Sequence, residues 1–76
     1  MSVSTPATII GRIKEASPLS PIAVFQCHVP GMLNAVFAST VATRELINNN
    51  APGFIGVYDR NCDLAKVKKM LEEHAK

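Results

Sequence analysis

Six side chains that could hold a metal ion or take part in catalysis fall in two short segments of the sequence. They are Cys27, His28, Asp59, Asn61, Cys62 and Asp63. Thiolate and imidazole groups bind zinc, and a cysteine beside a histidine base can act as a nucleophile. Each segment lies at the carboxyl end of an expected strand, and the carboxyl ends of parallel strands share one edge of a sheet. We therefore expect the six side chains to gather at one edge.

The spacing of these residues argues against a metal site or a nucleophile. The sequence has no CxxC or HxxxH pair, and Cys27 and His28 are neighbours on an expected strand, so they point to opposite faces. Gly31 and Gly53 belong to Pro-Gly turns and not to a phosphate-binding series such as GxGxxG. We expect no enzyme activity, no bound metal and no cofactor. A small Cys/His enzyme or metal-binding protein remains the second alternative.

The first residues and the cysteines bear on the cellular location. Residues 1–8 contain neither the basic segment nor the apolar core of a secretory signal, which predicts a cytoplasmic protein. Thiols stay reduced in that compartment, so we expect Cys27 and Cys62 to be free. The longest apolar runs have four residues, far fewer than the roughly 20 that a membrane-spanning helix needs. We expect no membrane partner.

The pattern of apolar residues, prolines and glycines predicts five elements. We expect a strand over residues 5–15, a strand over 22–29, a helix over 32–47, a strand over 54–59 and a helix from 64 to about 75. Two strands joined through a helix should be parallel, and the first strand should pair antiparallel with the second. The prediction is one α+β (small α/β) domain over residues 1–76. Its sheet is a single layer of three strands with mixed directions, and the helices lie mainly on one face.

One long stretch of the chain carries no charge. Residues 16–43 contain no Asp, Glu, Lys or Arg, although they include expected turns and part of a helix. Surface segments of soluble proteins normally carry charged residues, so the stretch indicates burial on more than one side. A chain of 76 residues buries only about 60% of its unfolded surface on folding. Part of this uncharged surface should therefore contact another molecule.

Two surfaces are candidates for that contact. On the expected helix, Leu33, Phe37 and Val41 form an apolar stripe at helical spacing, flanked by Arg44. The last helix could equally pack beside this stripe and cover it. On the expected sheet, Phe54 and Tyr58 share the face opposite the helices. An exposed apolar patch of this kind usually marks an interaction site.

The function that these surfaces favour is binding without catalysis. We expect a regulator or inhibitor that covers a surface of a protein partner or forms a homodimer, with Leu33, Phe37, Val41, Arg44, Phe54 and Tyr58 at the interface. One such role is that of the small inhibitors that phages encode against host defence, such as anti-CRISPR-type proteins. This expectation depends on the size and type of the chain and not on any particular residue.

Binding of single-stranded nucleic acid is the first alternative. Phe54 and Tyr58 on an open sheet could stack on bases, with Arg12 and Lys14 of the first expected strand placed to contact phosphates. The dense basic stripe of nucleic-acid-binding proteins is missing, because the formal net charge is only +2. This function is therefore less favoured than a protein partner.

Overall fold

The computed structural model describes residues 3–29, 31–38 and 40–75 of the chain. Seven elements follow one another in this part. They are β1 (Val3–Ser4), α1 (Pro6–Glu15), β2 (Ile22–Gln26), β3 (Leu33–Phe37), α2 (Val41–Asn48), β4 (Phe54–Tyr58) and α3 (Leu64–His74). The α+β class is confirmed, and the expected order of elements agrees roughly with the observed order.

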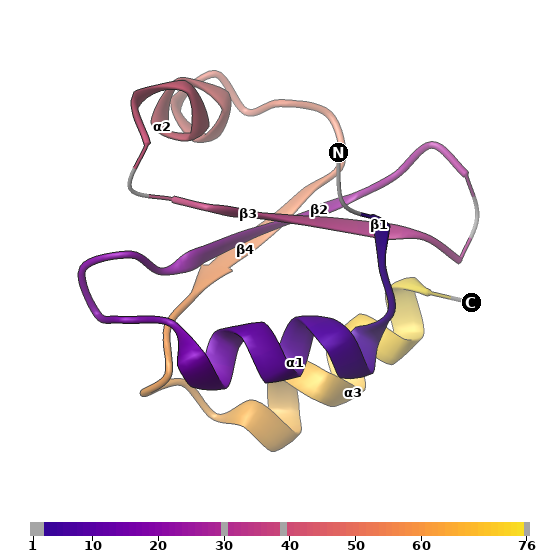
Figure 1. Cartoon of the computed structure of the whole chain (residues 1–76). Helices are drawn as coiled ribbons and strands as arrows, with labels where there is room; N and C mark the ends of the chain where they lie inside the picture. The colour runs from indigo at the N-terminus through magenta and orange to yellow at the C-terminus, as the bar shows by residue number, and fades with distance from the viewer. Residues whose placement is uncertain (1–2, 30, 39, 76) are drawn as a thin grey trace.

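The described strands form one sheet in the order β1-β3-β2-β4. Each neighbouring pair is antiparallel, so the expected mixed sheet and the parallel pairing of the second and third strands are wrong. β2 lies in the middle, where Val24 is opposite Ala35 of β3 and Gly56 of β4. Helices α1 and α3 cover one face, here called the two-helix face, and α2 lies over the other, the α2 face (Figure 1). The expectation of helices mainly on one face is confirmed.

Residues 6–15 form a helix and not the expected strand. Thr5 caps its start, because the Thr5 side chain accepts a hydrogen bond from the Thr8 backbone N–H at 3.3 Å. Pro6 follows the cap, where its missing N–H costs nothing. The three buried residues are Ile9, Ile10 and Ile13, at the i, i+1, i+4 spacing of one helical face. A loose alternation of apolar residues in the sequence concealed this helical period.

The expected helix over residues 32–47 is a strand in its first part and a helix in its second. Leu33–Phe37 is β3, which forms a hairpin with β2, and residue 39 lies outside the described residues. Thr40 then caps α2, accepting the Thr43 backbone N–H at 3.1 Å. Because the chain turns back at the hairpin before α2 begins, β4 runs antiparallel to β2.

The last two elements agree with the sequence pattern. β4 covers residues 54–58, and α3 covers 64–74 with Asp63 as its cap. The Asp63 carboxylate accepts the Lys66 backbone N–H at 3.2 Å. On α3, Val67 and Leu71 are buried, four residues apart on one face of the helix.

The two faces of the sheet are covered to different extents. The main core lies between the sheet and the two-helix face. Its largest fully buried side chains are Ile9, Ile13, Ile22, Val24, Leu33 and Leu71. A second, smaller cluster lies on the α2 face and contains Ala23, Phe25 and Ala38 as its buried members. Because β2 contributes to both clusters, its residues 22–25 are buried on both faces, which explains their lack of charge.

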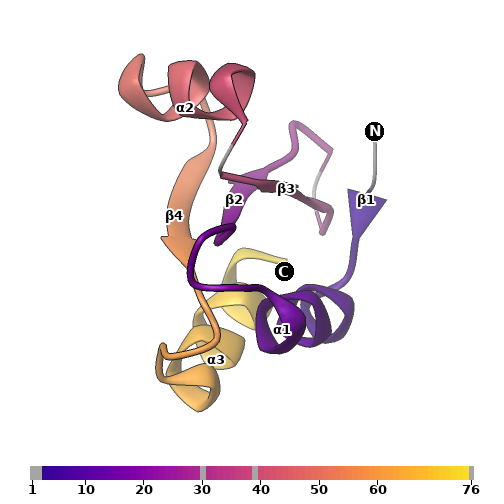
Figure 2. The same ribbon diagram turned by 60° about the vertical axis from the view of Figure 1, so that its left-hand side comes forward.

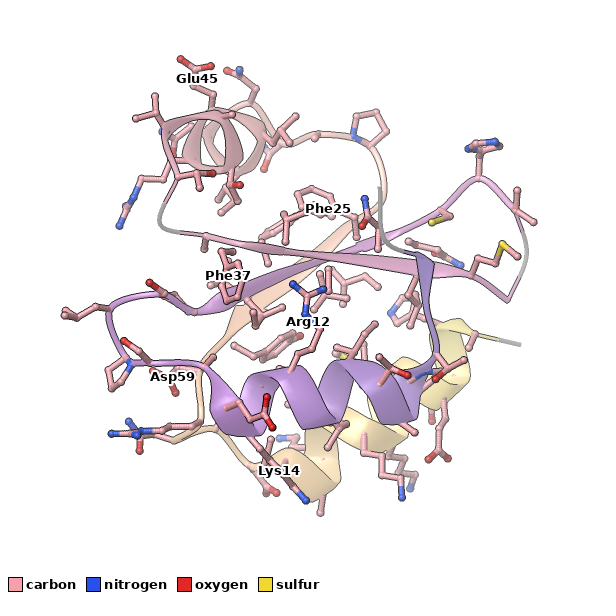
Figure 3. All side chains as sticks on the ribbon, in the orientation of Figure 1. Arg12, Lys14, Phe25, Phe37, Glu45 and Asp59 are labelled. Carbon is pink, nitrogen blue, oxygen red and sulfur yellow. The ribbon has the colours of Figure 1, made fainter. Side chains whose placement is uncertain are left out.

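Arg12 ties α1 to β3. Its Nη1 donates a hydrogen bond to the backbone carbonyl of Ala35 at 2.6 Å, and its guanidinium lies 5.4 Å from the ring centroid of Phe37 (Figure 3). β1 pairs only with Leu33 and Asn34, so Ala35 comes directly after the paired part of β3. Arg12 thus provides a hydrogen-bond donor where the described part of β1 provides none.

We expect Arg12→Ala to lower the free energy of unfolding by about 1–2 kcal/mol, because it removes a charged hydrogen bond and a cation–π contact. Lys14→Ala is the matched control on the same helix, where Lys14 is exposed, and should change stability by less than about 0.5 kcal/mol. Urea unfolding followed by circular dichroism measures both. Equal losses in the two variants would show that the Arg12 contacts contribute nothing.

Candidate apolar binding site

The structure does not bring the six candidate chemical residues to one edge. Cys27 and His28 follow β2, whereas Asp59 to Asp63 follow β4, and β2 and β4 are antiparallel. The two segments therefore leave opposite ends of the sheet. Cys62 packs against the main core, while Cys27 and His28 line a pocket on the α2 face. Within the described ranges, no group of three metal-ligating side chains is present.

Cys62 has an environment that disfavours its thiolate. Burial raises the pKa of the Cys62 thiol above its ordinary 9.0, and the carboxylates of Asp59 and Asp63 raise it further, against a lowering effect of a backbone hydrogen bond. Burial, together with the nearby Cys62, also raises the pKa of Tyr58 above 10.0. A nucleophilic cysteine needs the opposite shift, so this thiol has the properties of a structural residue.

The stripe of Leu33, Phe37 and Val41 does not form, because these residues belong to a strand and a helix. Leu33 is fully buried in the main core and is not available at a surface. Phe37 is 49% exposed beside Arg12, and Val41 is 76% exposed on α2. Arg44 is exposed on α2 and lines a smaller pocket beside Val57.

Phe54 and Tyr58 do not share a face of the sheet. The register shifts between Val24 and Phe25, so that β4 has one extra residue between Phe54 and Gly56. The Phe54 ring packs on Phe25 of the α2 face, with their centroids 5.3 Å apart. Tyr58 packs against the main core on the other face, and its hydroxyl donates to Met70 Sδ at 3.4 Å.

The aromatic platform expected for nucleic-acid binding is therefore absent from the described structure. Its basic members lie on α1 and not on a strand, and Arg12 is already bonded to Ala35.

A pocket of about 630 Å³ opens on the α2 face. Figure 1 shows α2 over one end of the sheet, while the β2–β3 hairpin extends past the other end. The pocket lies between them, with the loop after α2 as a third wall. Its lining residues are Phe25, Gln26, Cys27, His28, Val29, Met32, Asn34, Val36, Leu46, Ala51, Pro52 and Gly53. This volume is within the range of small-ligand sites, about 300–1,000 Å³.

The short α2 helix is the reason for the opening. α2 has eight residues, of which only Thr43 is buried, so it covers little of the sheet. Three large aliphatic side chains around the pocket remain partly exposed: Val29 at 42%, Met32 at 42% and Leu46 at 47%. They come from the hairpin and from α2, on opposite sides of the opening.

The third wall is held by backbone contacts. The Gln26 N–H donates to the Gly53 carbonyl at 2.6 Å, and the Phe54 N–H donates to the Ala51 carbonyl at 3.2 Å. Gly53 has a φ of +85°, and a Cβ at this position would collide with the Gln26 carbonyl oxygen. This glycine lets the loop lie close against the end of β2 and form the wall.

One polar atom at the pocket lacks a partner. Asn34 lines the pocket, and its Oδ1 is buried without a hydrogen-bond partner among the described residues. A buried acceptor without a partner costs about 1–3 kcal/mol. The site thus combines an apolar lining with one amide side chain, Asn34, whose acceptor is unsatisfied.

No protein-family model matches the chain, and comparisons with curated proteins and with solved structures found no match. In the part of the chain that the structure describes, no helix has the length and apolar character to span a membrane. The functional conclusion therefore depends on the geometry of the pocket.

Sequence reasoning missed the residues of the pocket but did find a signal for it. Val29, Met32 and Asn34 lie within the uncharged stretch 16–43, which predicted an apolar surface in need of cover. The location of the pocket depends on the β2–β3 hairpin, whose second strand, β3, fell within the expected helix over residues 32–47.

We expect the free energy of unfolding to fall as the pH rises above about 9, where the Cys62 thiol ionises in the unfolded chain but stays protonated in the folded one. A raised pKa in the folded state stabilises the protein below the unfolded value, and this contribution is lost as the pH rises through the folded value. Cys62→Ala should show a shallower fall than wild type, and Cys27→Ala is the matched control. Urea unfolding at a series of pH values tests this, and identical slopes in wild type and Cys62→Ala would contradict it.

Proposed function

We propose that the chain is a non-enzymatic binding protein of the cytoplasm. In this proposal, the pocket between α2 and the β2–β3 hairpin holds an apolar side chain of a protein partner or of a second copy. The pocket supports this proposal through one observation: Val29, Met32 and Leu46 surround it and are all partly exposed. Apolar side chains placed around a cavity gain free energy when another apolar group displaces the water.

The chemistry of the pocket favours a polypeptide as ligand. Its described lining includes no Asp, Glu, Lys or Arg, so the site selects for an uncharged group. Asn34 adds an acceptor that needs a donor. A polypeptide carries an apolar side chain next to a backbone N–H or a hydroxyl, and can therefore satisfy both parts of the site. A fully buried leucine contributes about 1.5–3 kcal/mol to such a contact.

The alternatives find less support in this pocket. Single-stranded nucleic acid binds through phosphate contacts from Lys and Arg, and neither residue type is among the described lining residues. Catalysis by Cys27 and His28 would need a third group to orient the imidazole. The described lining has no carboxylate, the Gln26 amide donates to the His74 carbonyl instead, and Asn34 Oδ1 has no partner.

Binding of an uncharged apolar dye tests whether the pocket accepts ligands. N-phenyl-1-naphthylamine has an aromatic body and one N–H donor, and we expect its fluorescence to rise on addition of the wild-type protein. Leu46→Asp should weaken its binding about tenfold or more, because it places a charge at the mouth of the pocket. Leu46 is 47% exposed, so the substitution leaves the core unchanged.

Val41→Asp is the matched control for the dye experiment. Val41 lies on the same helix, is 76% exposed and does not line the pocket, so this variant should bind the dye as the wild type does. Circular dichroism verifies that both variants are folded. Absence of a fluorescence rise with wild type, or equal binding by Leu46→Asp and wild type, would refute the pocket as a binding site.

A further inference from the structure

A second apolar feature lies in the turn between α1 and β2. Leu19 is 86% exposed, a larger fraction than for any other large hydrophobic side chain in the described part of the chain. The Ser17 hydroxyl accepts the Leu19 backbone N–H at 2.9 Å, and the Ser17 carbonyl accepts the Ser20 N–H at 2.9 Å. Pro18 and Pro21 restrict the backbone on either side. The turn therefore presents Leu19 in a fixed position, which lowers the entropy that a contact would cost.

This turn and the hairpin wall of the pocket are at opposite ends of the sheet, and Leu19 does not line the pocket of its own chain. In Figure 1 the turn joins α1 to β2 at one end of the sheet, and the β2–β3 hairpin that borders the pocket is at the other end. Leu19 therefore cannot fill the pocket of its own chain. It can reach only the pocket of another copy.

The turn and the hairpin share an unusual composition. Both lie at the surface, and both belong to the stretch 16–43 that has no charged residue. Surface turns usually carry charges, whereas the centres of protein interfaces are depleted of them. The turn before β2 thus exposes an apolar side chain, and the hairpin after β2 borders an apolar pocket.

We propose that Leu19 of one copy inserts into the pocket between α2 and the β2–β3 hairpin of the next copy, so that the chain associates head to tail with itself. This inference rests on the proposed function and names the partner as a second copy. The pocket is larger than one leucine and takes Leu19 together with exposed Pro18.

The contact has a defined symmetry. Two different surfaces meet, so each added copy leaves one free turn and one free pocket, and assembly continues to a ring or an open chain. A two-fold dimer would instead join the same surface of both copies. Because a single turn in a pocket buries less area than a standard interface, the association is weak and depends on concentration.

Sedimentation velocity over a concentration series, with a reducing agent present, tests the head-to-tail contact. Wild type should pass from monomer to species larger than a dimer as its concentration rises. Leu19→Asp keeps its pocket but loses the projecting leucine, and Leu46→Asp keeps the leucine but loses the pocket. Each variant alone should stay monomeric.

A mixture of the two variants gives the decisive measurement. Leu46→Asp supplies an intact turn and Leu19→Asp an intact pocket, so an equimolar mixture should form a heterodimer and nothing larger. Val41→Asp, outside both surfaces, should assemble as the wild type does. Leu19 is exposed, so its substitution leaves the fold intact, as circular dichroism can verify.

Three outcomes would overturn the proposal. These are a wild type that is monomeric at every concentration, a Leu19→Asp variant that assembles like wild type, and a mixture that stays monomeric. If Leu46→Asp alone loses assembly, the contact joins pocket to pocket and is not head to tail. Dye binding separates the two proposals: a monomeric wild type that binds the dye retains the pocket as a site and removes only the second copy as its partner.

Discussion

The structure depends on the burial of β2 on both of its faces. Ile22 and Val24 pack toward α1 and α3, while Ala23 and Phe25 pack toward α2. A strand of this kind needs an apolar layer above and below, and the chain has two helices for one side but only one short helix for the other. The main core is complete as a result, and the α2 face is not. The pocket is the space that this unequal distribution of helices leaves.

The sequence was sufficient to predict elements with strong local signals. β4 lies between a Pro-Gly turn and a polar segment, and α3 follows the capping residue Asp63 with an apolar face at helical spacing. The start of α1 had a comparable signal in Thr5 and Pro6, but the closely spaced isoleucines could be read with either period. The boundary between β3 and α2 had no Gly or Pro to mark it. Its cap, Thr40, lies in a run that favours a helix throughout.

The candidate site was less predictable than the class of the fold. The uncharged stretch contains the buried strand β2 and the exposed Leu19 and Met32. The residues predicted to form an interface depended on the wrong elements. The bulge in β4 is the clearest example, because one extra residue reverses the face on which Phe54 lies relative to Tyr58. Alternation along a strand cannot reveal such a shift, which is set by how β4 fits against Phe25. Cys27 and Cys62 were likewise separated by strand direction, a property of the whole sheet.

The two outer edges of the sheet are protected from pairing with other strands in different ways. Figure 2 shows β4 at one outer edge of the sheet. The bulge in β4 interrupts its regular ladder with β2. At the other edge, Arg12 donates a hydrogen bond to Ala35 of β3, just beyond the residues of β3 that pair with β1. Unprotected strands rich in Ile, Val and Phe recruit like strands and grow into amyloid. A guanidinium on one side and an irregular backbone on the other oppose such cross-β stacking. The two edges of the sheet are thus protected against cross-β pairing, although the chain exposes uncharged apolar side chains around the pocket.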